Sequence, residues 1–313
     1  MKVSIVIPVY YNQENLYPLY ESIKDKLYTH SEYEWEIILV DDGSKDNSYQ
    51  VMQEIASKDD AVKICRLSRN FGSHAAVLCG LSKCEGECTV VKAADLQEPT
   101  ELILEMIESW KEGNNVVLAV RKDRKDGIIQ KIFANTYYWF VRKFALREMP
   151  KGGFDVWLVD KKVVHVLMQL DEKNSAITGQ ILWSGFRTGK VYYTRLQREI
   201  GKSKWTLKKK IRLVTDTLFS FSTLPISIVT GLGIISLIGA SIWAIYVLIY
   251  RLLDQIPVSG WTSLFIFQLF SFGVIMFSLG ILGNYLWRIF DATRNRPPYI
   301  IEDDSSESEY IKR

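Results

Sequence analysis

The chain has 313 residues, 48% of them hydrophobic, and a formal net charge of +3. This length fits about two domains, and a charge so close to neutral gives no reason to expect a nucleic-acid partner. Of the four cysteines, Cys84 and Cys88 have three residues between them, but the sequence has neither the second pair nor the nearby histidine that would complete a zinc site. We therefore expect the cysteines to be small core residues.

The first part of the sequence alternates apolar strands with amphipathic helices. Strands are predicted over residues 3–9, 35–40, 62–67, 88–93 and 115–120, and helices over residues 15–27, 46–57, 73–83 and 99–112. Such alternation predicts a mostly parallel sheet covered by helices on both faces. The nearly continuous Val and Ile content of the strands agrees with burial on both sides. The expected fold class is therefore α/β.

Polar side chains follow the carboxyl ends of the five predicted strands, where open α/β sheets bind their ligands. They are Tyr10, Asn12 and Glu14, then Asp41 and Asp42, then Arg69 and Asn70, then Asp95 and Gln97, and finally Arg121 and Arg124. The sequence has neither G-x-G-x-x-G after the first strand nor G-x-x-x-x-G-K-[ST], so a dinucleotide fold or a P-loop enzyme is not indicated. We expect a single site for a polar, phosphate-bearing ligand.

The fourth predicted strand ends at Asp95, and Gln97 follows shortly before Pro99. A carboxylate with a second oxygen ligand at a strand end can hold Mg²⁺ or Mn²⁺ against the phosphates of a substrate. The alternative is a plain strand end in which Asp95 caps the next helix. Further on, residues 128–146 carry aromatic side chains at helical spacing with cationic neighbours, which fits either a membrane-interface helix or a helix that covers the sheet.

Two long stretches, residues 217–250 and 255–287, contain no charged residue. Each exceeds the ~20 residues that span a bilayer as a helix. We predict transmembrane helices at about 224–250 and 263–287, joined as a hairpin within residues 216–290. Lysine and arginine residues flank the hairpin on its outer ends, at Lys208, Lys209, Lys210, Arg288 and Arg294, so the positive-inside rule places both termini in the cytoplasm.

This topology makes the protein a multi-pass component of the plasma membrane. Residues 1–215 become a cytoplasmic domain and residues 291–313 a cytoplasmic tail. A reducing compartment argues against disulfides. Two spans bury little surface between them, so we expect homo-oligomers in the lipid bilayer. A small transporter is excluded, because spans without ionisable residues offer no polar pathway.

Five segments carry a family resemblance: residues 8–14 (PVYYNQE), 40–48 (VDDGSKDNS), 68–72 (SRNFG), 94–99 (ADLQEP) and 198–205 (REIGKSKW). The first three resemble the signatures of the GT-A-fold family-two glycosyltransferases. The last two look like the polyprenyl-phosphate sugar synthases, which include dolichol-phosphate mannose synthase and the bactoprenol glucosyltransferases. The resemblance covers the whole chain and implies a GT-A domain, a Rossmann-like fold with a mostly parallel sheet, followed by two spans.

The resemblance also implies roles for individual residues. A nucleotide-sugar donor is expected at Pro8, Tyr10, Asn12, Glu14, Asp41, Asp42, Arg69, Asn70 and Asp95. Asp95 and Gln97 correspond to the ligands of Mg²⁺ or Mn²⁺, and the phosphates of donor and lipid are expected at Arg121, Arg124, Arg198, Lys202 and Lys204. The catalytic candidates are Asp95 and Asp155, with Asp155 beside the acceptor, and Glu98 is expected to matter far less than Asp95.

Two positions depart from the family pattern. Ala93 stands where relatives often have the first acid of an Asp-x-Asp motif, so one metal ligand is absent, and Trp157 stands where many have an arginine. Two assignments keep an alternative. Asp155 can be a solvated loop acid, and the basic run at residues 198–204 can simply hold anionic lipid.

The implied reaction is inverting transfer of a sugar from a nucleotide-sugar to undecaprenyl or another polyprenyl phosphate, for glycosylation of the cell envelope. A UDP-sugar such as UDP-glucose is favoured as donor. The lipid phosphate needs no strong base, because its second pKa is about 6. Alternatives are an enzyme like dolichol-phosphate mannose synthase that uses GDP-mannose, and a non-enzymatic membrane partner that keeps the fold. A processive polysaccharide synthase would carry Q-x-x-R-W, which the sequence lacks.

Overall fold

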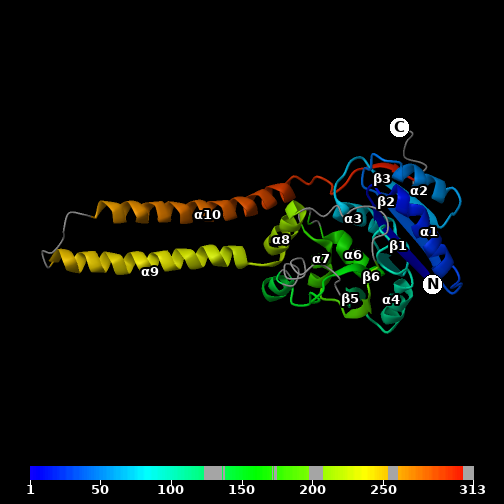
Figure 1. Cartoon of the computed structure of the whole chain (residues 1–313), viewed down its shortest axis with the longest axis horizontal. Helices are drawn as coiled ribbons and strands as arrows, with labels where there is room; N and C mark the ends of the chain where they lie inside the picture. Colours follow the sequence, from blue (N-terminus) through cyan, green and yellow to red (C-terminus); the bar gives the residue numbers. More distant parts are fainter. Residues whose placement is uncertain are drawn as a thin grey trace.

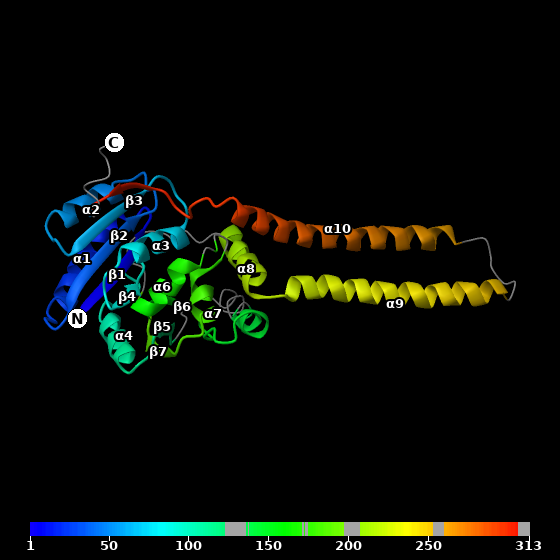
Figure 2. The same cartoon turned by 180° about the vertical axis from the view of Figure 1, so that it is seen from behind.

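The computed structural model describes residues 1–122, 136, 138–170, 172, 175–196, 207–252 and 260–305. These residues form an α/β domain from which two long helices extend side by side (Figures 1 and 2). The amino-terminal strand lies inside the domain, and the chain returns to the same domain after the second long helix.

The described part of the chain has one eight-stranded sheet in the order β7-β5-β6-β4-β1-β2-β3-β8. The strands are β1 (Lys2–Val9), β2 (Glu34–Asp41), β3 (Val62–Leu67), β4 (Cys88–Val91), β5 (Val116–Arg121), β6 (Phe154–Asp160), β7 (Thr188–Tyr193) and β8 (Ile301–Asp304). Strands β1 to β4, β5 and β7 run in one direction, and only β6 and β8 are antiparallel to their neighbours. The expected mostly parallel α/β sheet is therefore confirmed, with β6 inserted between β4 and β5.

Helices cover both faces of this sheet. They are α1 (Gln13–Leu27), α2 (Ser48–Ala56), α3 (Ser73–Lys83), α4 (Leu102–Lys111), α6 (Lys161–Gln169) and α7 (Ile177–Trp183). Alternate side chains of a strand point to opposite faces, so Ile37 packs with α1, α2 and α4, whereas Ile38 packs with α3, α6 and α7. Two apolar cores thus enclose the sheet and hold the ends of its strands rigidly.

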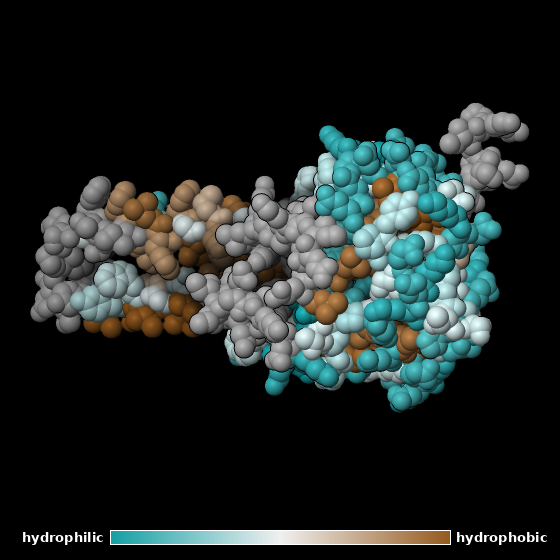
Figure 3. All heavy atoms as spheres, turned by 45° about the vertical axis from the view of Figure 1, so that its right-hand side comes forward, coloured by the Kyte–Doolittle hydropathy of each residue, from teal (hydrophilic) through white to brown (hydrophobic). Residues whose placement is uncertain are grey.

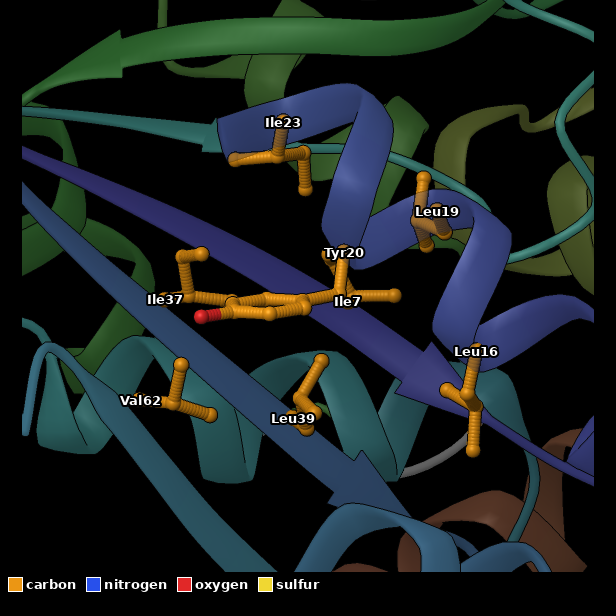
Figure 4. A pocket seen from close by; sticks show the side chains of 8 residues that line it. All are labelled: Ile7, Leu16, Leu19, Tyr20, Ile23, Ile37, Leu39 and Val62. Carbon is orange, nitrogen blue, oxygen red and sulfur yellow. The ribbon is translucent and has the colours of Figure 1, made fainter. Parts of the chain in front are cut away.

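The core beneath α1 contains a cavity of about 10 Å³, lined by Ile7, Leu16, Leu19, Tyr20, Ile23, Ile37, Leu39 and Val62. Figure 4 shows these side chains between α1 and strands β1 to β3. A space of this size holds about one water molecule at most. It is a packing gap, and any ligand must bind elsewhere.

Of the predicted helix at residues 128–146, the structure describes residue 136 and residues 138–146. Val141 and Leu146 are buried in the core with α3 and α6, whereas Trp139 is 50% exposed. The Lys143 ammonium lies 5.0 Å from the centre of the Trp139 ring. This segment therefore covers the sheet, and its contact with a membrane stays a prediction.

The remaining helices are α8 (Leu207–Phe221), α9 (Leu224–Leu252) and α10 (Trp261–Thr293). Two stretches, Leu224–Tyr246 and Phe267–Thr293, are long and apolar enough to cross a membrane, with mean hydropathies of 2.1 and 1.7 and none of the span buried in the protein. Figure 3 shows apolar residues on the long helices and mainly hydrophilic residues on the visible face of the domain.

The base of this helix pair is fixed to α8. Arg288 on α10 donates from Nη2 to Asp216 Oδ1 at 2.8 Å and from Nη1 to Ser220 Oγ at 3.0 Å. The rings of Phe219 and Tyr285 are in edge contact, with centroids 5.2 Å apart. Helix α8 in turn packs on α7 of the domain. The two long helices are thus anchored to the α/β domain through α8.

The segment after α10 forms a strand that the sequence analysis did not predict. Strand β8 pairs with β3 in antiparallel register, with Cys65 opposite Asp304 and Arg66 opposite Asp303. The Ser68 amide also donates to the Ile300 carbonyl at 2.9 Å. Because both ends of the helix pair join one sheet, the α/β domain and the tail lie at the same end of that pair (Figure 1).

Candidate active site

The first half of the site is built from two loops that interlock. The Asp42 carboxylate accepts hydrogen bonds from the backbone amides of Phe71, at 2.7 Å, and Gly72, at 3.0 Å. Gly43 has φ of +67°, and a Cβ atom there would lie 2.5 Å from the carbonyl carbon of Arg69. Only glycine fits such a close approach with positive φ. The loops after β2 and β3 therefore hold each other in one conformation.

Asp41 lies deeper than Asp42. Its side chain is fully buried, accepts from the Ser44 amide at 3.1 Å and has Oδ2 3.5 Å from Arg66 Nε. Burial raises the pKa of both Asp41 and Asp42, and the hydrogen bonds to their carboxylates oppose that rise. In this structure both acids hold backbone turns, so the binding of a nucleotide-sugar donor by this pair stays a prediction.

Other residues that are predicted to bind the nucleotide-sugar lie near these turns. The Tyr10 hydroxyl is raised in pKa mainly by burial, and it lies close enough to Asn70 for a hydrogen bond and to Asp42 for a charge effect. The backbone amide of Asn12 donates to Ser48 Oγ at 2.9 Å. Pro8 is at the end of β1, Glu14 is exposed in the first turn of α1, and Arg69 is exposed with its guanidinium over the Phe71 ring at 3.9 Å. The structure thus brings Tyr10, Asp42 and Asn70 together.

The second half of the site is the turn after β4. Leu96 has φ of +57°, which places Asp95 and Gln97 on a tight bend. The Leu196 amide donates to the Gln97 carbonyl at 2.9 Å, and Gln97 Nε2 donates to the Leu196 carbonyl at 3.4 Å. Helix α4 begins only at Leu102, after Glu101 as its N-cap, so the alternative in which Asp95 caps this helix is wrong.

A buried cluster of charges supports this turn. The Glu98 and Lys92 side chains are each 1% exposed, with Lys92 Nζ 4.0 Å from Glu98 Oε2, and Lys92 Nζ also donates to the Glu98 carbonyl at 2.6 Å. Arg195 Nη2 lies 3.9 Å from Asp95 Oδ2 and 4.0 Å from Glu98 Oε1. Arg195 therefore bridges the two carboxylates. Sequence reasoning missed Arg195, because it lies nearly one hundred residues from the motif that it contacts.

Burial acts on the two central charges in opposite directions. It raises the pKa of the Glu98 carboxyl and lowers the pKa of the Lys92 ammonium, and the charge of each partner opposes the shift. Neither carboxylate oxygen of Glu98 has a hydrogen-bond donor in the described part of the chain. A buried carboxylate must be compensated, so this structure gives Glu98 a role in stability. The expectation that Glu98 matters far less than Asp95 for turnover stays a prediction. The sequence feature that could have indicated this cluster is Lys92, a lysine inside the apolar run 90–94.

Arg121 and Asp155 form a second ion pair close to this cluster, since the Arg121 charge acts on the Glu98 carboxyl. They form an ion pair across β5 and β6, with the Arg121 side chain 12% exposed and that of Asp155 40% exposed. Asp155 is therefore a strand residue held by an arginine and not a loop residue, although its side chain is partly exposed to solvent. Two residues on, Trp157 is 2% exposed in the apolar core, so this position contributes no charge to the site.

The donor set Asp95 and Gln97 fits a hard divalent cation. Mg²⁺ is often held by one or two carboxylates together with the phosphates of a substrate. Asp95 would supply the single carboxylate that is the minimum, and the side-chain amide oxygen of Gln97 would add a second ligand. The part of the chain that the structure describes has no group of three or more His, Cys, Asp or Glu residues that would hold a metal without a substrate. Arg124, Arg198, Lys202 and Lys204 lie outside the described residues.

The family of the protein follows from comparison with known sequences. Residues 4–169 match the family described as glycosyl transferase family 2. The chain belongs to this family. It is therefore a glycosyltransferase of GT-A fold. The mixed sheet with helices on both faces agrees with this assignment.

Individual relatives match over nearly the full chain. An uncharacterized glycosyltransferase of Bacillus subtilis, YkcC, is 36% identical over 96% of this chain and 94% of its own length. A prophage-derived bactoprenol glucosyl transferase of Shigella flexneri is 33% identical over 96% of this chain and 98% of its own. Among solved structures, glucosyl-3-phosphoglycerate synthase of Mycobacterium tuberculosis with Mn²⁺ and UDP-glucose has a TM-score of 0.45 at 14% identity and covers 70% of this chain and 79% of its own.

Proposed function

We propose that the protein transfers a sugar from a nucleotide-sugar to a polyprenyl phosphate, with inversion at the anomeric carbon. A UDP-sugar such as UDP-glucose is the favoured donor. The observation that carries the proposal is the grouping of two ion pairs, Asp95 with Arg195 and Asp155 with Arg121, at the edge of the sheet where β4, β5 and β7 end. Support for a lipid acceptor comes from the likeness to the Shigella flexneri bactoprenol glucosyl transferase along the whole chain.

Departure of the nucleoside diphosphate is the first chemical problem. Charge develops on the leaving diphosphate, and preorganised cations stabilise such charge most in a site with little water. Arg195 and Arg121 are placed for this role, since their side chains are 31% and 12% exposed and lie against Asp95 and Asp155. A divalent cation held by Asp95 and Gln97 would supply Lewis-acid stabilisation of the same phosphates.

Attack by the acceptor is the second problem. A phosphate monoester is largely ionised near neutral pH, because its second pKa is about 6. The acceptor therefore needs alignment more than it needs a base. Asp155, fixed by Arg121 at the start of β6, serves as a positioning group in a single displacement. Arg124, Arg198, Lys202 and Lys204 are proposed to bind the phosphates beside it.

The lipid acceptor requires a membrane topology. We propose that α9 and α10 cross the cell membrane as a hairpin, with both termini in the cytoplasm. The pairing of β8 with β3 supports an even number of crossings, since both strands belong to one sheet. A reporter fused after Arg313 should be cytoplasmic, and a tag within residues 254–260 should be accessible from outside; an external C-terminus would contradict this topology.

The test of the activity uses the purified full-length protein. It is incubated with undecaprenyl phosphate, Mg²⁺ or Mn²⁺, and one of UDP-glucose, UDP-N-acetylglucosamine, UDP-galactose or GDP-mannose, and lipid products are identified by mass spectrometry. A glycosylated lipid from a UDP-sugar is the expected result. Product from GDP-mannose alone would favour the mannose synthase alternative. No product with any donor would overturn the proposal and favour a non-enzymatic membrane partner.

A further inference from the structure

Arg66 on β3 connects the C-terminal strand to the turn that follows β2. Its Nε atom lies 3.4 Å from Glu302 Oε2 on β8 and 3.5 Å from Asp41 Oδ2. One guanidinium thus faces a partly exposed carboxylate of the tail and a fully buried carboxylate of the candidate donor site. The Arg66 side chain is 35% exposed and the Glu302 side chain 54% exposed.

The tail also holds the Tyr49 ring, which lies beneath the Arg66 guanidinium. Arg66 Cζ lies 4.9 Å from the centre of the Tyr49 ring, and the Tyr49 hydroxyl donates to Asp303 Oδ2 at 2.6 Å. Burial and the Asp303 carboxylate both raise the pKa of Tyr49, so the hydroxyl keeps its proton as a donor. Strand β8 therefore contacts Arg66 through Glu302 and its supporting ring through Asp303.

The position of Arg66 matters because Asp41 has few other charge partners. Its buried carboxylate accepts from the Ser44 amide, and Ser44 Oγ in turn accepts from the Tyr11 amide at 2.9 Å. A shift of the guanidinium away from Asp41 would leave that carboxylate less compensated, and the turn at residues 41–44 would relax. The loop at 68–72 is tied to the tail as well, through the bond from the Ser68 amide to the Ile300 carbonyl at 2.9 Å.

We propose that β8 is a positioning element of the nucleotide site: Glu302 and Asp303 hold Arg66 and Tyr49 so that Asp41 and its turn keep the geometry that binds the nucleoside of the donor. This role rests on the proposed function, because it assigns the nucleoside to that turn. It makes the segment after the membrane helices part of the donor site, although that segment touches no substrate itself.

The test compares variants within the same strand, in the full-length protein in detergent. Glu302→Gln removes the charge that faces Arg66, Glu302→Asp keeps it, and Asp304→Asn is the matched control, because Asp304 faces Lys83 at 2.6 Å on α3 and not Arg66. The primary measurement is the dissociation constant of UDP, and of GDP, by calorimetry. The KM of the nucleotide-sugar, the KM of the lipid, kcat and the unfolding temperature are measured beside it.

We expect Glu302→Gln to raise the dissociation constant and the donor KM about threefold, the size of effect that a partly exposed ion pair gives. Tyr49→Phe should act in the same direction, whereas Glu302→Asp should stay close to wild type. The KM of the lipid and kcat should be unchanged. General unfolding would not weaken nucleotide binding while leaving these two quantities as they are. The Asp304→Asn control should leave nucleotide binding unchanged.

Unchanged nucleotide affinity in both Glu302→Gln and Tyr49→Phe would overturn the role of β8. An equal loss in Asp304→Asn would also overturn it, because the effect would then come from a loosened strand. If wild type binds UDP or GDP without transferring a sugar, the proposed function fails and the role of β8 is still decided by the dissociation constants. If wild type binds neither nucleotide, both proposals are wrong.

Discussion

The two halves of the candidate site are held in place by different forces. Around Asp42, backbone amides at 2.7 and 3.0 Å and the close approach at Gly43 hold the loops. Around Asp95 and Glu98, Arg195 Nη2 lies 3.9 Å from the Asp95 carboxylate and 4.0 Å from the Glu98 carboxylate, distances that are longer than those of hydrogen bonds. In the donor half, the loops around Asp42 are thus fixed by hydrogen bonds, whereas the charged half, where we propose that a cation and phosphates bind, is held by attraction between ion pairs. A substrate's diphosphate would join the two.

Glu98 gives the largest expected effect on the charged half. Glu98→Ala leaves the Lys92 ammonium buried without its carboxylate, and breaking a buried pair in this way costs about 3–5 kcal/mol of unfolding free energy. Urea unfolding of the full-length protein measures this loss. The matched control is Glu101→Ala, since Glu101 pairs with Lys26 at the surface. Equal stability of the two variants would contradict the buried cluster.

Replacing Asp95 tests the chemistry of the charged half separately from the stability of the protein. Asp95→Ala should lower turnover at least ~10²-fold, as the loss of one strong electrostatic stabiliser does. The unfolding temperature should fall less than in Glu98→Ala, because the Asp95 side chain is 16% exposed whereas that of Glu98 is 1% exposed. Ala93→Asp, which completes the Asp-x-Asp pattern that the family resemblance implies, should keep activity or tighten metal binding. Near-normal turnover of Asp95→Ala with Mg²⁺ or Mn²⁺ would remove Asp95 from the mechanism.

Gly43 tests the donor half. Gly43→Ala introduces a Cβ atom at positive φ, which costs ~1–2 kcal/mol before any clash, and this atom would meet the Arg69 backbone. We expect weaker nucleotide binding together with lower stability, read by calorimetry and by urea unfolding. Gly113→Ala is a control with φ of +92° but only an arginine side chain nearby. If both variants bind nucleotide equally well, the interlocked loops do not shape the donor site.

The smallest expected effect is a dependence of stability on pH. Burial raises the pKa of Glu98 above the ordinary 4.5. The folded state therefore binds the proton more tightly than the unfolded state, and this contribution is present below 4.5 and is lost as pH rises through the raised pKa. Glu98→Gln should flatten that part of the curve of unfolding free energy against pH. A curve that keeps the wild-type slope would assign the dependence to other groups, such as Asp41 and Asp42.

The sequence predicted those parts of the molecule that depend on local pattern. Strands such as residues 3–9 and 62–67 were recognised because continuous apolar runs end at polar turns, and the helix pair because its runs lack charge. Long-range partners were not recognised. Arg195 reaches Glu98 only through the fold, and β8 is too short and polar to indicate a strand. The burial of Trp157 likewise follows from β6 lying between β4 and β5.

Strand β8 also sets an order for the biogenesis of the protein. Ile64 and Ser305 are hydrogen-bonded although 241 positions separate them, and the two long helices lie between them in the chain. During synthesis the edge of β3 stays unpaired until both long helices and β8 have been made. An unpaired strand edge is a template for aggregation. The sheet that begins at the start of the chain is therefore completed only when β8 has been made, so a chain that ends before β8 leaves an exposed edge that quality-control proteases and chaperones can recognise.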